Sequence, residues 1–194
     1  MSARALARGL ALGAAALAVG VWSSTEQGRE RDMKGFRAVN SGRGPGADRV
    51  YAGVTELGSW WAAGAAAGAL ALTGNPRAAA RALEAASLTW FASQGLKRLV
   101  LRPRPYEADP DGTRLLIGKP NGTSWPSSHP AVLVTFLTVA GRELGLAGGA
   151  RRALSGLSNA VGVSRVYLGV HYPSDVASGV LLGRAVAELF SSGR

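Results

Sequence analysis

Both histidines of the chain lie in short polar stretches that interrupt a sequence rich in alanine, glycine, leucine and valine. His129 stands in WPSSHP, residues 125–130, and His171 stands in SRVYLGVHYPSD, residues 164–175. Asp175 follows His171 by four residues, a spacing at which a helical turn brings a carboxylate to one nitrogen of the imidazole ring. The other ring nitrogen is then free for nucleophilic attack, whereas His129 has no carboxylate at that spacing and suits a general acid.

Three cationic residues accompany these histidines and indicate the charge of the ligand. Lys97 and Arg104 lie in KRLVLRPRP, and Arg165 precedes His171 by six residues. Arginine binds phosphate oxygens in pairs and lysine acts as a point charge, so three cations with Asp175 as the one nearby carboxylate favour a compact multivalent anion. Phosphate fits best, because the same charges would stabilise the negative charge that grows during phosphoryl transfer.

The segment PSSH, residues 126–129, predicts the start of a helix that faces the same anion. We expect Ser127 to cap this helix with its side chain, which leaves the N–H groups of Ser128 and His129 free to point at an anion. Pro130 is compatible with this position, since the first N–H groups of a helix have no partner within it.

Six apolar segments of helical length carry these residues, and no strand pattern competes with them. The segments cover 5–22, 57–76, 78–101, 129–147, 151–170 and 173–190. Between the first two lies a polar segment, from Ser23 to about Asp48, that we expect to be partly helical around MKGFRAVN. In an up-and-down bundle the end of the third segment, the start of the fourth, the end of the fifth and the start of the sixth share one face. The polar stretches therefore meet.

The strongest indication of a membrane setting is the segment 57–76, which has no charged residue and is long enough to cross the ~30 Å hydrocarbon layer. Its run AAGAAAGALAL is typical of helices that pack closely in lipid. We therefore expect an all-α, integral-membrane bundle of about five to six helices. A soluble all-α bundle is the alternative that the mean hydropathy of +0.10 leaves open.

The N-terminal segment 5–22 is either a retained membrane helix or a cleaved signal sequence. No clean small-x-small cleavage site follows it, which favours the retained helix. We divide the chain into residues 1–52, an anchor-like or signal-like helix with a polar surface segment, and residues 53–194, the core that carries the polar stretches. No long linker separates the two parts.

Composition argues against several other classes of protein. The formal net charge is +10, yet the arginines are dispersed from Arg4 to Arg194 and the few aromatic residues are not interleaved with them. This distribution is not that of a nucleic-acid-binding surface. Because the chain has no cysteine, it forms neither disulfides nor thiolate metal sites, and its two histidines make no obvious metal-binding pattern.

The polar stretches resemble the three signature motifs of the type 2 phosphatidic acid phosphatase (PAP2) superfamily, which includes lipid phosphatases, bacterial acid phosphatases and vanadium haloperoxidases. The matching positions are Lys97, six residues and Arg104-Pro105; then PSSH at 126–129; then Ser164-Arg165, five residues, His171, three residues and Asp175. This three-part match spans roughly residues 97–175 and is highly specific.

The resemblance implies a role for each matching residue. His171 is implied as the nucleophile that forms a phosphohistidine, Asp175 as its orienting partner and His129 as the general acid. The phosphate-binding residues implied by the motifs are Lys97, Arg104, Ser127, Ser128 and Arg165. The family chemistry requires neither a metal nor another cofactor.

Two positions depart from the family pattern. Ser128 replaces the usual glycine of the second motif, so that a hydroxyl either adds a contact or crowds the site. Arg102-Pro103 is a second Arg-Pro pair out of register. Spacing favours Arg104 as the phosphate ligand, and whether Arg102 shares that role stays open.

By resemblance we expect a metal-independent membrane phosphatase that acts on a lipid phosphate monoester or diphosphate. The first expected substrates are polyprenyl carriers of cell-envelope synthesis, of the undecaprenyl diphosphate or decaprenyl-linked phosphoribose type. The alternatives are a phosphatidic acid or phosphatidylglycerol phosphate phosphatase, a vanadium haloperoxidase-like enzyme, and a non-catalytic protein that binds anionic lipid. The oligomeric state stays open.

The distribution of arginines predicts which side of a cell membrane the site faces. If the first segment starts inside, the site-bearing loops fall on the periplasmic or exterior side of a multi-pass protein. The arginines that then lie on the cytoplasmic side include Arg77, Arg81, Arg142, Arg151 and Arg152.

Overall fold

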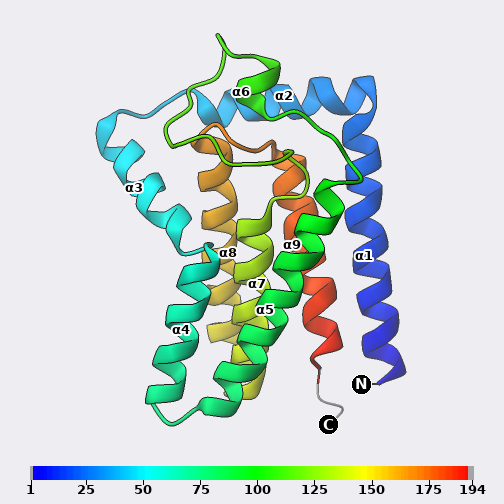
Figure 1. Cartoon of the computed structure of the whole chain (residues 1–194), viewed down its shortest axis with the longest axis vertical. Helices are drawn as coiled ribbons and strands as arrows, with labels where there is room; N and C mark the ends of the chain where they lie inside the picture. The colour runs from blue at the N-terminus through cyan, green and yellow to red at the C-terminus, as the bar shows by residue number, and fades with distance from the viewer. Residues whose placement is uncertain (1, 192–194) are drawn as a thin grey trace.

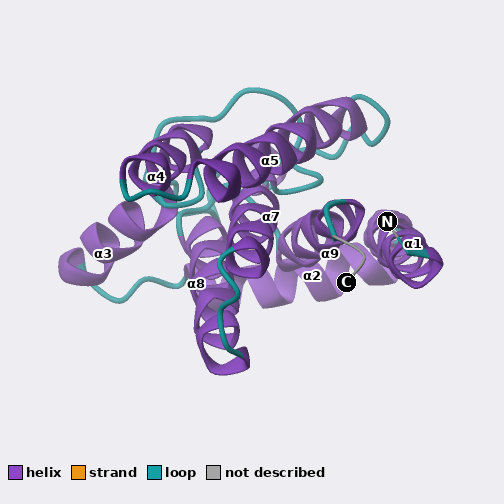
Figure 2. Ribbon diagram, turned by 90° about the horizontal axis from the view of Figure 1, so that it is seen from below, coloured by secondary structure: helices purple, strands orange, loops and turns teal. Residues whose placement is uncertain are grey.

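Helices and loops make up the whole of the computed structural model in the part of the chain that it describes, residues 2–191 (Figures 1 and 2). The helices are α1 (Ala3–Ser24), α2 (Glu26–Asn40), α3 (Pro45–Glu56), α4 (Trp60–Leu72), α5 (Pro76–Lys97), α6 (Pro105–Ala108), α7 (Ser128–Glu143), α8 (Gly148–Tyr167) and α9 (Pro173–Leu189). The expected all-α class is confirmed.

The number of helices is higher than the five to six expected, since nine lie within residues 2–191. The additional elements are short and come from polar sequence. The polar segment holds two helices, because Thr25 caps α2 by accepting a hydrogen bond from the Gly28 N–H at 3.1 Å, and Pro45 starts α3. A single turn, α6, follows Arg104.

The sequence predicts one membrane-length helix over the uncharged segment 57–76. The structure does not form that helix. Ser59 caps α4 by accepting a hydrogen bond from the Ala62 N–H at 3.0 Å, so the helix starts late. Gly74, with φ +83°, ends it, and Pro76 opens α5. The 13 residues of α4 span only about 20 Å. Within residues 2–191, α1 is the one helix both long enough and apolar enough to cross a membrane by length and composition.

The helix α7 occupies the middle of the bundle and contacts α5, α8 and α9 (Figure 2). On the outside, α1 packs along α9, and α4 packs along α5 (Figure 1). The core between α5 and α7 combines small residues on α5 with larger ones on α7: Ala79, Ala82, Ala85 and Ala86 pack with Val132, Phe136 and Val139. The small side chains let the helix backbones approach closely.

A second layer lies across one end of the bundle, where α2 runs over the ends of α8 and α9 (Figure 1). The buried face of α2 repeats every four residues and consists of Gly28, Asp32, Phe36 and Asn40. Phe36 packs edge-on against Tyr172 with ring centroids 5.8 Å apart. This end of the bundle also holds the C-terminus of α5 and the N-termini of α7 and α9, so the predicted polar stretches meet there.

The contact between α7 and α9 depends on a glycine. A Cβ atom added at Gly183 would lie 2.4 Å from the carbonyl oxygen of Ala131 and 2.4 Å from a methyl group of Val134. The hydroxyl of Thr135 donates to the Gly183 carbonyl at 2.9 Å across the same contact. Because backbone lies against backbone, α9 has no room to accommodate a side chain at this position.

We expect Gly183→Ala to lower the free energy of unfolding by about 1–3 kcal/mol, because the added methyl group forces α9 away from α7. The matched control is Gly156→Ala on α8, where a Cβ meets nothing within 4 Å. That change is expected to raise stability by about 0.5–1 kcal/mol. Thermal unfolding of the purified full chain measures both. Equal effects of the two substitutions would contradict the close-contact argument.

Candidate active site

A cavity of about 130 Å³ lies at the end of the bundle where α5 ends and α7 begins. Six of the eight residues singled out in the sequence line it: Lys97, Arg104, Ser128, His129, Arg165 and His171. The other two, Ser127 and Asp175, are completely buried and do not line the cavity. The sequence analysis did not point to Trp60, Trp90, Gln94 and Asn121, which also line it.

His171 lies in the loop between α8 and α9 and presents one ring nitrogen to the cavity side. Its Nε2 is 3.3 Å from Nη1 of Arg104, and its Nδ1 is 3.5 Å from Oδ2 of Asp175. The latter separation is longer than a hydrogen bond, and Nδ1 has no hydrogen-bond partner in the described chain. A small rotation of the ring would therefore complete the contact with Asp175.

The charge environment keeps the His171 imidazole neutral. Burial lowers the pKa of His171 well below its usual range, and the positive charges of Arg104 and Lys97 lower it further. A neutral ring retains the lone pair on one nitrogen at neutral pH. A neutral imidazole can act as a nucleophile without a base that first deprotonates it.

Asp175 is held by a full set of hydrogen bonds. Its Oδ1 accepts from Arg102 at 2.7 Å, and its Oδ2 accepts from the Ser124 hydroxyl at 2.5 Å and from the Tyr172 N–H at 2.9 Å. The bond to Tyr172 is a helix cap, because Asp175 is the third residue of α9. Local backbone geometry and a buried cation therefore fix the carboxylate beside His171.

The two neighbouring Arg-Pro pairs have different surroundings. Arg104 lines the cavity, whereas Arg102 lies behind Asp175 and does not line it. Arg102 donates to Asp175 and, at 2.6 Å, to Asp32, and its guanidinium stacks 4.0 Å from the centre of the Tyr172 ring. The register that favoured Arg104 from the sequence thus agrees with its position in the structure.

Asp32 is a buried residue of the site that the sequence analysis missed. It lies on α2 with 4% of its surface exposed, and it accepts hydrogen bonds from the Ser174 N–H at 3.0 Å, the Ser174 hydroxyl and Arg102. The signal that could have revealed it is the spacing of Asp32, Phe36 and Asn40, which places three residues on one helix face. A lone aspartate in a polar segment gives no other indication of burial.

Backbone carbonyls and hydroxyls, not carboxylates, hold the three cavity cations. Arg104 donates to the carbonyls of Gly122, Val170 and Asn121 at 2.9, 2.9 and 3.2 Å. Lys97 donates to the Thr123 carbonyl at 2.8 Å, and Arg165 donates to the Thr55 hydroxyl at 2.9 Å. None of the three forms an ion pair with a carboxylate within residues 2–191. No carboxylate of the described chain therefore neutralises these groups, and the cavity suits an anion.

The expectation that the Ser127 side chain caps α7 is wrong. Ser127 occupies the N-cap position, but its buried hydroxyl has no hydrogen-bond partner among the described residues. The residue is held through its backbone instead, because its N–H donates to the Asp175 carbonyl at 3.0 Å. Its own carbonyl lies so close to Gly179 that a Cβ there would approach to 2.3 Å.

Ser128, which stands where the family has glycine, adds a polar group to the cavity. Its hydroxyl accepts a hydrogen bond of 3.3 Å from the Gln94 amide, and both residues line the cavity. His129 follows on the first turn of α7 and faces the same space. With His171, two imidazoles and three cations thus surround a volume that can hold a phosphate group.

Comparison with known proteins places this geometry in a family. The model of the PAP2 superfamily matches residues 78–193. The decaprenylphosphoryl-5-phosphoribose phosphatase of Mycolicibacterium smegmatis is 31% identical over 160 residues, which cover 81% of this chain and 84% of that protein. The protein of the same name from Mycobacterium tuberculosis strain H37Rv is 37% identical over 97 residues, half of each chain.

Two solved structures share the fold. The crystal structure of Aquifex aeolicus LpxE superposes with a TM-score of 0.73 at 26% identity, covering 81% of this chain and 93% of that one. The transmembrane PAP2 type phosphatidylglycerolphosphate phosphatase from Bacillus subtilis has a TM-score of 0.74 at 22% identity, with 94% of each chain covered. Since the family match extends over the segment that holds most of the cavity, from Trp90 to His171, the chain belongs to the PAP2 superfamily.

Proposed function

We propose that this protein is a membrane phosphatase that hydrolyses the phosphate of a polyprenyl-linked lipid through a phosphohistidine intermediate. The observation that carries the proposal is the position of His171 Nε2, 3.3 Å from Arg104, in a cavity whose three cations have no carboxylate partner among the described residues. Such a cavity binds a multivalent anion beside a neutral nucleophile.

In the first step, Nε2 of His171 attacks phosphorus while the bond to the leaving oxygen breaks. Lys97, Arg104 and Arg165 bind the non-bridging oxygens and stabilise the charge that builds on them. Asp175, beside Nδ1, stabilises the positive charge that develops on the ring. The negative charge of the bound phosphate offsets the positive charge of the cations, so His129 takes up a proton as the substrate binds. It then donates this proton to the leaving oxygen, and the lipid-linked product departs as a neutral alcohol.

In the second step, water attacks the phosphohistidine and His129 accepts a proton from it. The bond between phosphorus and Nε2 breaks, inorganic phosphate forms, and His171 returns to its neutral state. The general acid of the first step thus acts as the base of the second, and one residue restores the starting protonation state. Both steps use only side chains that line the cavity or lie directly behind it.

The size and surroundings of the cavity support a lipid substrate. A volume of about 130 Å³ holds a phosphate group but not the rest of a lipid, so the chain of the substrate must stay outside. Trp60 and Trp90 line the cavity, and the neighbouring Trp61 is 80% exposed. Tryptophan is enriched where protein meets the lipid headgroups, so this edge suits a substrate that arrives from the bilayer.

The surface of the bundle supports a multi-pass placement in the membrane. Large apolar side chains are exposed on α1, α4 and α5, among them Leu10, Val21, Leu72 and Phe91. The helices α1, α5, α7, α8 and α9 contain 22, 22, 16, 20 and 17 residues, or roughly 24–33 Å of length. The lengths of α1, α5 and α8 suit a hydrocarbon layer of ~30 Å even where the helix also carries charges, and α7 and α9 are about one turn shorter.

Charge asymmetry supports a cavity that faces the periplasm or exterior. Arg77, Arg142, Arg151 and Arg152 lie at the helix ends opposite to the cavity, where the positive-inside rule places the cytoplasm. The division of the chain into residues 1–52 and 53–194 stays a prediction. Packing of α1 along α9 favours a retained first helix.

Among lipid phosphates, we favour a decaprenyl-linked phosphoribose phosphate. The support is the relative from Mycolicibacterium smegmatis, which is 31% identical over most of both chains. The Bacillus subtilis phosphatase shares the fold at 22% identity, and at that identity its substrate carries no weight here. Undecaprenyl diphosphate, phosphatidic acid and phosphatidylglycerol phosphate are therefore the comparison substrates.

The purified protein in detergent is expected to release phosphate from decaprenylphosphoryl-5-phosphoribose faster than from the comparison lipids, measured as inorganic phosphate in excess chelator. The His171→Ala protein should release none, because the substitution removes the imidazole that attacks phosphorus. Exclusive turnover of water-soluble phosphate esters would contradict the lipid substrate. Full activity of His171→Ala would contradict the assignment of the nucleophile.

His129→Ala is expected to lower kcat by about 10²–10⁴-fold on a lipid phosphate, because the alkoxide then leaves without a proton. A substrate with a better leaving group, such as p-nitrophenyl phosphate, needs less protonation and should recover part of this loss. Phosphate release from both substrates measures the difference. An equal loss on both would show that His129 acts in binding and not as the acid.

Asp32→Asn is expected to lower the free energy of unfolding by about 3 kcal/mol, because it removes one of the two carboxylates that neutralise the buried Arg102. It should also lower kcat, since Arg102 then holds Asp175 less firmly. The control is Asp109→Asn, whose partner Arg37 lies 2.7 Å away but is exposed to solvent. Thermal unfolding of the two variants tests the prediction, and equal small effects would show that Asp32 is dispensable.

A further inference from the structure

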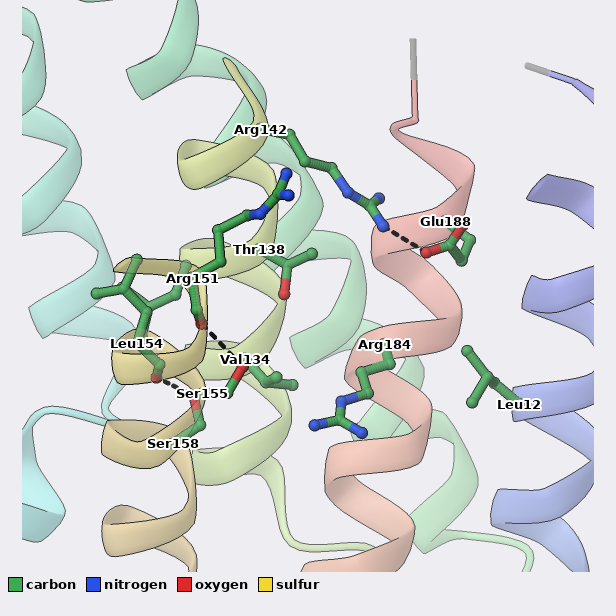
Figure 3. A pocket seen from close by; sticks show the side chains of 11 residues that line it. Leu12, Val134, Thr138, Arg142, Arg151, Leu154, Ser155, Ser158, Arg184 and Glu188 are labelled. Atoms are coloured by element: carbon green, nitrogen blue, oxygen red, sulfur yellow. Dashed lines mark hydrogen bonds and ion pairs between the residues drawn. The ribbon is translucent and has the colours of Figure 1, made fainter. Parts of the chain in front are cut away.

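A second polar cavity, of about 430 Å³, lies toward the end of the bundle opposite to the active site. Figure 3 shows the side chains that line it. It opens between the end of α9, the start of α8 and the last turns of α7. Three arginines line it, Arg142, Arg151 and Arg184. None of the residues of the active-site cavity takes part in it.

The positive charge of this second cavity exceeds its negative charge. Glu188 is its one carboxylate, and it forms an ion pair with Arg142, which also donates to the Ala187 carbonyl at 2.7 Å. Arg151 and Arg184 form no ion pair among the described residues. An adjoining cavity shares Arg142, Arg151 and Glu188 and adds Arg4, Arg8 and one further carboxylate, Glu143. Two guanidinium groups therefore lack an anionic partner.

The absence of an anionic partner matters most for Arg184 because of its position in α9. Arg184 stands five residues before the end of α9, or about 7.5 Å inside it. Figure 3 shows its side chain directed into the cavity and away from the C-terminal end of α9. A charged group at that depth needs an anion or water beside it.

The other walls of the cavity identify the kind of anion. Leu12, Val134, Leu137 and Leu154 supply apolar surface, and Thr138, Ser155 and Ser158 supply hydroxyl groups beside the arginines. A ligand with a phosphate and an acyl chain satisfies both kinds of wall. A phospholipid of the leaflet at this end carries both groups in one molecule.

We propose that this cavity binds the phosphate of an anionic phospholipid in the leaflet opposite to the active site. The inference rests on the membrane placement proposed above. Arg184 and Arg151 contact the phosphate oxygens, while the acyl chains lie against the leucines of α1, α7 and α8. The lipid thereby fills the space between α8 and α9 at this end of the bundle.

Native mass spectrometry of the full chain in detergent, titrated with phosphatidylglycerol or phosphatidylcholine, tests the proposal. The variant Arg151→Gln/Arg184→Gln removes the two arginines without a carboxylate. The control Arg77→Gln/Arg152→Gln removes two arginines at the same end that are exposed, as Arg151 and Arg184 are, but that do not line the cavity. We expect about tenfold weaker phosphatidylglycerol binding for the first variant and less than about a twofold change for the control.

Equal losses in the two variants, or equal binding of phosphatidylcholine and phosphatidylglycerol by the unmodified protein, would overturn the proposal. Glycerol 3-phosphate serves as a competitor, and displacement of the lipid at equimolar concentration would show that a free phosphate is the ligand instead. Lipid hydrolysis is assayed on the same samples. A protein that binds phosphatidylglycerol through these arginines but releases no phosphate would refute the proposed enzymatic activity and leave this site standing.

Discussion

The buried carboxylate of Asp175 is the constraint on which the rest of the active-site end depends. A carboxylate with no exposed surface is stable only when several donors surround it, and Arg102, Ser124 and the Tyr172 N–H provide them. Arg102 in turn is a buried cation that needs a second carboxylate, which Asp32 supplies from α2. The N-terminal part of the chain is thus joined electrostatically to the residue beside the nucleophile.

The two arginines of RPRP show how environment separates identical side chains. Arg102 is neutralised by two carboxylates and so attracts no further anion. Arg104, two residues later, is held by carbonyl oxygens, which fix its direction but leave its full charge unbalanced. Proline restricts the backbone between them, so that the two guanidinium groups lie on opposite sides of the His171–Asp175 pair.

Much of the fold could be predicted from the sequence because apolar periodicity and helix breakers are local signals. Four helices, α5, α7, α8 and α9, correspond to the predicted segments 78–101, 129–147, 151–170 and 173–190. The up-and-down order of these helices brings the polar stretches at their ends together. The prediction of one long helix over 57–76 was wrong, because a serine cap and Gly74 set the ends of the helix even though the segment has no charge. Hydropathy indicates whether a segment is apolar enough to enter a membrane, whereas capping determines where its helix ends.

The site was harder to predict from the sequence where two residues in contact are far apart along the chain. Asp32 and Ser174 are separated by 142 positions, and nothing in either neighbourhood indicates the other. A bare positive charge is easier to interpret, because a guanidinium that lacks a carboxylate must find an anion elsewhere. That criterion holds at both ends of the bundle: Arg104 and Arg165 beside two imidazoles favour a reacting phosphate, and Arg151 and Arg184 beside leucines favour a phosphate that only binds.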